Sequence, residues 1–94
     1  MKLTEIIANS KDIGELKKQI NSLEKYNLTS REIKIIDKKI LKNLEREQVL
    51  DILVILGNWY CAYNSHEDWK KIKSKLLKDE EVSEKTRDYL AVID

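Results

Sequence analysis

A chain of 94 residues is long enough to bury one hydrophobic core and too short for two. Its content of 41% apolar and 37% charged residues excludes an intrinsically disordered chain. The formal net charge of +1, from 18 basic and 17 acidic residues, excludes a strong overall field that would draw the protein to nucleic acid or to an anionic membrane.

The residue types favour helices over strands. Proline is absent, there are two glycines, and strand formers other than isoleucine are scarce. The chain therefore lacks the turn residues that sheets and hairpins require between their strands. We therefore expect an all-α fold. It should be a compact bundle of five or six short helices around one apolar central helix, forming a single domain over residues 1–94.

The first part of the chain predicts two short helices. One begins near Thr4 and ends near Asn9. Ser10 or Asp12 can then provide the N-cap of a second helix. The apolar residues of this second helix recur every three or four positions, as on one face of an amphipathic helix: Ile13, Leu16, Ile20 and Leu23.

A third helix is predicted after a break at residues 26–29. Thr29 and Glu32 have the spacing of a capping box, which marks a helix start. The pattern becomes polar at residues 43–48, where we expect a tight turn; the alternative is one long helix over residues 30–63. The apolar stripe of the third helix comprises Ile33, Ile36, Ile40 and Leu44, widened by Leu41.

The opening of this third helix resembles the start of the LuxR-type helix-turn-helix domain. The resemblance covers the nine residues 28–36, LTSREIKII. The glycine turn and polar recognition helix of that family are replaced here by apolar VLDILVIL, which suits a core and not a major groove. We interpret the resemblance as a shared capping box and transfer no functional residue from the family.

Residues 49–64 are predicted to form the central helix. They are apolar on almost every side of a helix, which indicates that several neighbours surround it. A buried strand is the alternative, but the segment is too long for one and has no partner strands. Asp51 interrupts the apolar run. It should either pair with a basic residue of the third helix or mark the one edge that faces water.

Two further helices should complete the bundle. Ser65 is the predicted N-cap of a fifth helix, which carries acidic residues in its first turn. Its buried side should consist of Trp69, Ile72 and Leu76. A last short helix opens at Val82 and Ser83 and carries Tyr89, Leu90, Val92 and Ile93.

Cys61, His66 and Asp68 are the residue types of a nucleophile, a base and an orienting carboxylate. We favour a structural interpretation, because Cys61 lies in the apolar helix, where cysteine is usually a small buried hydrophobe. One cysteine and one histidine cannot form an internal disulfide or complete a structural zinc site. We therefore expect a non-enzymatic protein of the cytoplasm, with no cofactor or metal.

An aromatic cluster at the junction of the fourth and fifth helices is the strongest binding signal. Tryptophan and tyrosine are enriched in interface hot spots, but in a chain without phenylalanine they are also the large core fillers. Both interpretations stay open. The basic stretch WKKIKSKLL follows, and an acidic segment comes directly after it. This order of charges favours a solvated helix face over a phosphate-binding one. The candidate partner-binding residues are Trp59, Tyr60, Tyr63, Trp69, Lys70 and Lys73.

These observations favour a small protein-binding module: an inhibitor, an immunity-type protein, an adaptor or a bacterial or phage modulator. It would occlude or bridge a protein partner, with a second copy of the chain as another partner. The alternative is a nucleic-acid-associated transcriptional regulator that uses the lysines of the third and fifth helices. A membrane is not an expected partner, because the longest apolar run is about half the roughly 20 residues that a spanning helix needs.

Overall fold

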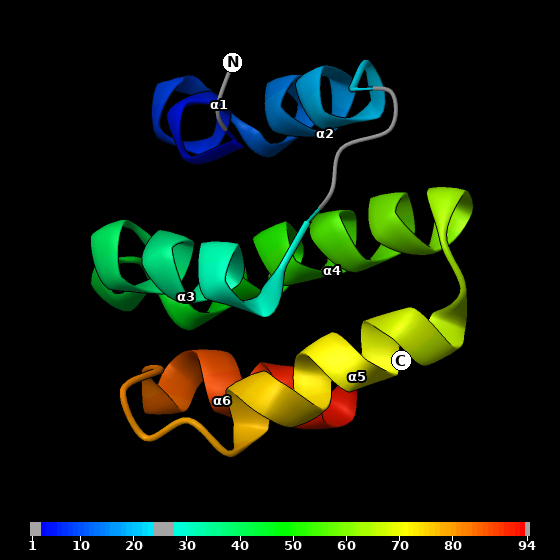
Figure 1. Ribbon diagram of the computed structural model, residues 1–94. Coiled ribbons are helices and arrows are strands. Elements are labelled where there is room, and N and C mark those ends of the chain that lie inside the picture. Colours follow the sequence, from blue (N-terminus) through cyan, green and yellow to red (C-terminus); the bar gives the residue numbers. More distant parts are fainter. Residues whose placement is uncertain (1–2, 24–27, 94) are drawn as a thin grey trace.

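The computed structural model describes residues 3–23 and 28–93. Within these residues the chain forms six α-helices and no strand, so the all-α prediction is confirmed (Figure 1). The elements are α1 (Leu3–Asn9), α2 (Ile13–Asn21), α3 (Ser30–Lys39), the short 3-10 turn η1 (Leu41–Asn43), α4 (Arg46–Tyr63), α5 (His66–Leu77) and α6 (Glu84–Val92).

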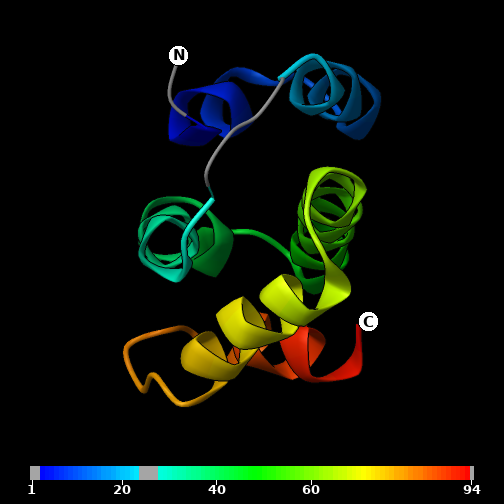
Figure 2. The ribbon, with the colours of Figure 1, turned by 45° about the vertical axis from the view of Figure 1, so that its right-hand side comes forward.

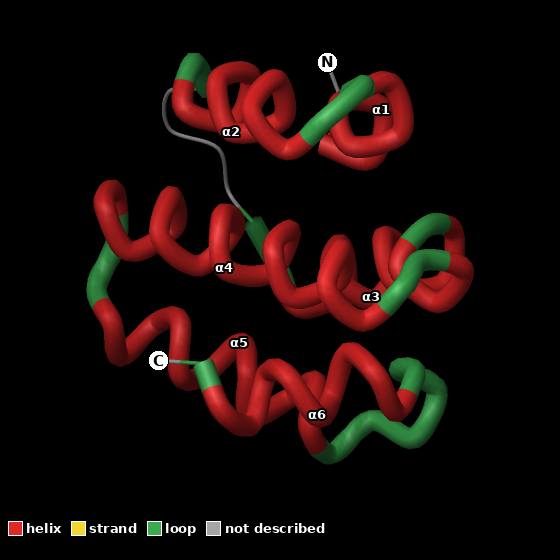
Figure 3. Tube along the Cα trace, turned by 180° about the vertical axis from the view of Figure 1, so that it is seen from behind, coloured by secondary structure: helices red, strands yellow, loops and turns green. Residues whose placement is uncertain are grey.

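The helices are arranged in three tiers, each made of a pair of consecutive helices. In Figure 1, α1 and α2 form one outer tier, α3 and α4 the middle one, and α5 and α6 the other outer tier. The turned view in Figure 2 and the rear view in Figure 3 show the same order. Because α4 packs against α2, α5 and α6, it is the central helix that its apolar sequence predicts.

Local capping groups start the helices where the sequence indicates. The Asp12 carboxylate accepts a hydrogen bond from the Glu15 backbone N–H at 2.8 Å, so Asp12 and not Ser10 caps α2. Thr29 Oγ1 accepts from the Glu32 N–H, and Ser65 Oγ accepts from the Asp68 N–H, both at 3.2 Å. The predicted break at residues 26–29 lies partly outside the described residues.

The link between α3 and α4 differs from its prediction. Helix α3 ends at Lys39, so the expected extension of its stripe to Leu44 is wrong, and so is the alternative of one helix over residues 30–63. The chain turns instead through η1, which places Leu41 in the core. The Lys85 ammonium of α6 donates hydrogen bonds to the carbonyls of Lys42 and Leu44, and these contacts hold the turn.

Helix α4 has a wide buried face and one open edge. Its buried face includes Leu53 and Leu56, each with no exposed surface. Asp51 is exposed and Val54 is 38% exposed, and Asn58 continues the same edge one turn further. Of the two alternatives for Asp51, the water-facing edge is therefore correct. None of the helices within the described ranges is long and apolar enough to cross a membrane.

Candidate interaction surface

Most of the predicted aromatic cluster lies in the core. Trp59 is 3% exposed, Tyr60 9% and Trp69 0%. The Trp59 indole N–H donates to the Leu23 carbonyl at 3.2 Å, which ties α4 to the end of α2. Tyr63 differs from the other three, because half of its surface (51%) is open to solvent, although its ring packs edge-on against Trp59. Of the predicted cluster, Tyr63 in the last turn of α4 is therefore the ring that lies open to solvent.

The two predicted lysines also lie in different surroundings. Lys70 is exposed. Lys73 is half-buried, and its ammonium donates to the Ile93 carbonyl at 2.6 Å, which fastens the end of α6 to α5. Of the six predicted partner-binding residues, Tyr63 and Lys70 are thus the two that lie open to solvent.

The structure brings Cys61 and His66 together at the surface. The Cys61 Sγ atom lies 3.5 Å from His66 Nδ1. Burial raises the pKa of the Cys61 thiol, and the nearby Lys73 ammonium offsets part of that rise. A raised pKa favours the protonated thiol, which is the less nucleophilic form. In the described part of the chain, no group of three or more metal-ligating side chains is present.

A groove separates α3 from α5 along one side of the molecule. Its volume is about 460 Å³. Ile35, which is 38% exposed, and the buried Leu76 supply its apolar surface. Side chains of both charges stand around these two residues: Arg31, Lys34, Lys38, Lys75, Asp79 and Glu81. The sequence predicts both helices but not this groove, which we call the α3–α5 groove.

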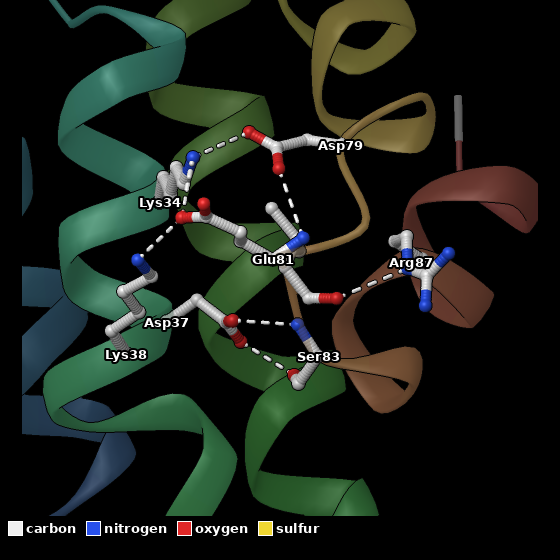
Figure 4. Close-up of polar contacts among 8 residues, drawn as sticks. Lys34, Asp37, Lys38, Asp79, Glu81, Ser83 and Arg87 are labelled. Carbon is white, nitrogen blue, oxygen red and sulfur yellow. Dashed lines mark hydrogen bonds and ion pairs between the residues drawn. The ribbon is translucent and has the colours of Figure 1, made fainter.

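Four of the residues that line this groove form a surface ion-pair cluster (Figure 4). Lys34 Nζ lies 2.8 Å from a carboxylate oxygen of Asp79 and 3.1 Å from one of Glu81. Lys38 Nζ lies 2.7 Å from the same Glu81 oxygen. The Lys34 ammonium holds the pKa of Asp79 below its ordinary value, and Lys38 and Lys34 do the same for Glu81. Lys34 and Lys38 of α3 are thus already paired with carboxylates of the chain itself.

A buried polar junction lies beside the ion-pair cluster. Asp37 of α3 is only 1% exposed, and its carboxylate accepts hydrogen bonds from the Ser83 N–H at 2.8 Å and the Ser83 hydroxyl at 2.6 Å. The hydroxyl of Thr86 also donates to it. Asp37 therefore caps the N-terminus of α6 from another helix. We call Asp37, Ser83 and Thr86 the buried junction.

Asp37 was not predicted to be a buried residue, although its position in the sequence indicates that it is. Asp37 stands four residues after Ile33 and one after Ile36, which places it on the buried stripe of α3. A carboxylate on such a stripe needs a partner, because burying an unpaired charge is costly. The partner lies 46 residues further along the chain, and nothing local identifies it.

The outer side of α5 and its C-cap carry a group of exposed lysines. Lys70, Lys71, Lys75 and Lys78 are all exposed, and none of them forms an ion pair with another described residue. They fall within about 140° of the helix circumference, at 100° per residue. We call these four residues the α5 lysine face. Lys75 also lines the α3–α5 groove, so the two features form one continuous surface.

No protein family, curated protein sequence or solved structure matches this chain. The function proposed below therefore depends on the sequence and on the geometry of this surface.

Proposed function

We propose that this protein is a small, non-enzymatic protein-binding module that occludes or bridges a protein partner through the α3–α5 groove. The observation that carries the proposal is the composition of the groove, in which apolar Ile35 and Leu76 are surrounded by side chains of both charges. An apolar centre with a polar rim is the usual anatomy of a protein–protein interface. A segment of another protein can bury Ile35 and pair with the charges around it.

Two of the predicted contact residues are open to solvent, and one of them lies on a surface that adjoins the groove. Lys70 belongs to the α5 lysine face, which adjoins the groove through Lys75. Tyr63, three residues before the start of α5, offers an exposed ring with a hydroxyl. Tyrosine combines a large apolar area with a polar tip, which suits a contact half open to water. Tyr63 and Lys70 therefore remain candidate contacts.

The test of this function uses a variant of the groove and a control matched in exposure. Ile35 and Val54 are each 38% exposed, but Val54 lies on the open edge of α4. Ile35→Asp should remove capture of a stoichiometric protein partner from the cell of origin, whereas Val54→Asp should leave it unchanged. Both purified variants should keep the wild-type melting temperature. The proposal fails if no stoichiometric partner is captured, or if both variants capture it equally.

One observation favours the nucleic-acid alternative. Because α3 and α5 pack together, basic residues of both helices line the same groove. However, Asp79 and Glu81 already pair with Lys34 and Lys38, and their charges would repel a phosphate backbone. Titration with duplex and single-stranded oligonucleotides at low salt separates the two functions. Binding that weakens steeply as salt is added would favour the alternative.

A further inference from the structure

Two lysines of α3 contact carboxylates of the same chain, and this contact serves as a guide to the unpaired lysines of α5. Lys34 and Lys38 are one helical turn apart, and they receive Asp79 and Glu81, which are two residues apart in a turn of the chain. A short acidic segment thereby contacts two lysines on one side of a helix. The contact lies at the surface, where Lys38 is 48% and Glu81 63% exposed.

Helix α5 repeats this lysine spacing without ion pairs to Asp79 and Glu81. Lys71 and Lys75 are one turn apart, and Lys78 continues the row after three further residues. Four residues of α-helix rise about 6 Å. Two residues of an extended strand advance about 6.6 Å, and side chains two apart point to the same side. An extended segment with carboxylates at alternate positions therefore matches Lys71 and Lys75 in spacing and direction, and Lys78 follows about 4.5 Å further along the helix axis.

The charges around this row also favour an acidic partner. Arg31 lies across the groove from Lys75. Asp79 and Glu81 pair with lysines of α3, which leaves the three lysines of α5 uncompensated by them. Glu67 stands one turn before Lys71 and weakens the basic character of that end, so the basic character of the row is strongest at Lys75 and Lys78.

We propose that Lys71, Lys75 and Lys78, with Arg31 across the groove, bind an acidic segment of the partner protein that has aspartate or glutamate at alternate positions. This inference rests on the proposed protein-binding function and names the chemistry of its partner. Apolar residues of the same segment would cover Ile35, because exposed Ile35 and Lys75 line the same groove.

The experiment measures fluorescence anisotropy of a labelled peptide in which glutamate alternates with leucine and serine. The probes for comparison are the same peptide with glutamine in place of glutamate and a single-stranded oligonucleotide of equal charge. The variant is Lys71→Glu with Lys75→Glu. Its matched control is Lys17→Glu with Lys18→Glu, on the exposed side of α2.

We expect the acidic peptide to bind the wild-type protein and the α2 control alike, and to bind the α5 double variant at least about tenfold more weakly. The glutamine peptide should not bind. The inference is overturned if reversal of the α5 charges leaves peptide binding unchanged, if the acidic peptide does not bind at all, or if the oligonucleotide binds more tightly than the peptide. If a partner is still captured in an Ile35-dependent way, such a result rejects only the acidic chemistry and not the protein-binding function.

Discussion

The buried junction and the surface ion-pair cluster both join α3 to the chain between α5 and the first turn of α6, but only the junction is shielded from water. Asp37 and Thr86 of the junction are 1% and 0% exposed, whereas the Lys38 and Glu81 side chains of the cluster are 48% and 63% exposed. Water can replace a partner that is removed from the cluster. It cannot readily do so inside the junction, so we expect the two sites to differ in their effect on stability.

Asp37→Ala is expected to have the largest effect. It leaves the Ser83 N–H and the hydroxyls of Ser83 and Thr86 without their acceptor at the start of α6. Removal of one partner from a buried, charged hydrogen-bond network should lower the free energy of unfolding by about 3 kcal/mol. Urea unfolding followed by circular dichroism measures this loss.

The matched control for this variant is Asp51→Ala, because Asp51 is an exposed aspartate on the open edge of α4. A surface substitution of this kind should change the free energy of unfolding by less than about 0.5 kcal/mol. Equal losses in the two variants would show that the Asp37 carboxylate does not hold α6 in place.

Thr86→Val should have a smaller effect in the same junction. Valine keeps the shape of threonine but lacks the hydroxyl that donates to Asp37. The Ser83 N–H and hydroxyl still donate to the carboxylate, so we expect a loss of about 1 kcal/mol. Combination with Asp37→Ala should add less than Thr86→Val does alone, because the Asp37 acceptor is already gone and only the hydrogen bond from the Ser83 hydroxyl to Thr86 Oγ1, at 3.2 Å, is left to lose. A fully additive double variant would mean that the two side chains stabilise the fold independently.

The contrast between local and distant partners also explains how far the sequence predicts this fold. The starts of α2, α3 and α5 were predictable because their caps, Asp12, Thr29 and Ser65, bond to residues three positions later. The end of α3 was not, because Lys85 of α6 holds the turn that follows it.

The candidate surface was less predictable than the helices. Trp59 and Tyr63 are one turn apart on α4, yet only Trp59 is buried, because its indole reaches the end of α2 at Leu23. The α3–α5 groove depends on how two helices separated in sequence pack together. The composition of α5 identifies its lysines, but the pairing of Asp79 and Glu81 with α3, and not with these lysines, is seen only in the structure.

The smallest effect is expected for the ion-pair cluster, in the double variant Asp79→Asn with Glu81→Gln. At neutral pH its melting temperature should be slightly below that of the wild type. Lys34 and Lys38 hold the carboxyl pKa values below their ordinary values of 3.8 for Asp79 and 4.5 for Glu81. A lowered pKa in the folded state stabilises the protein above the ordinary pKa, and the stabilisation is lost as the pH falls through the lowered pKa. The difference between wild type and variant should therefore disappear in acid.

The quantity to measure is the difference in melting temperature between wild type and variant, because the remaining carboxylates are present in both proteins and their contributions largely cancel. Lys34 provides a second check, since its partners raise its pKa above the ordinary value of 10.5 and their contribution should be lost as the pH rises through that raised pKa. Concentrated salt should reduce the difference at neutral pH, because exposed charges are screened. The loss caused by Asp37→Ala should persist in the same salt. If the difference between wild type and the double variant persisted in both acid and salt, the prediction would be wrong. Asp79 and Glu81 would then stabilise the fold as the buried junction does, and not as exposed charges do.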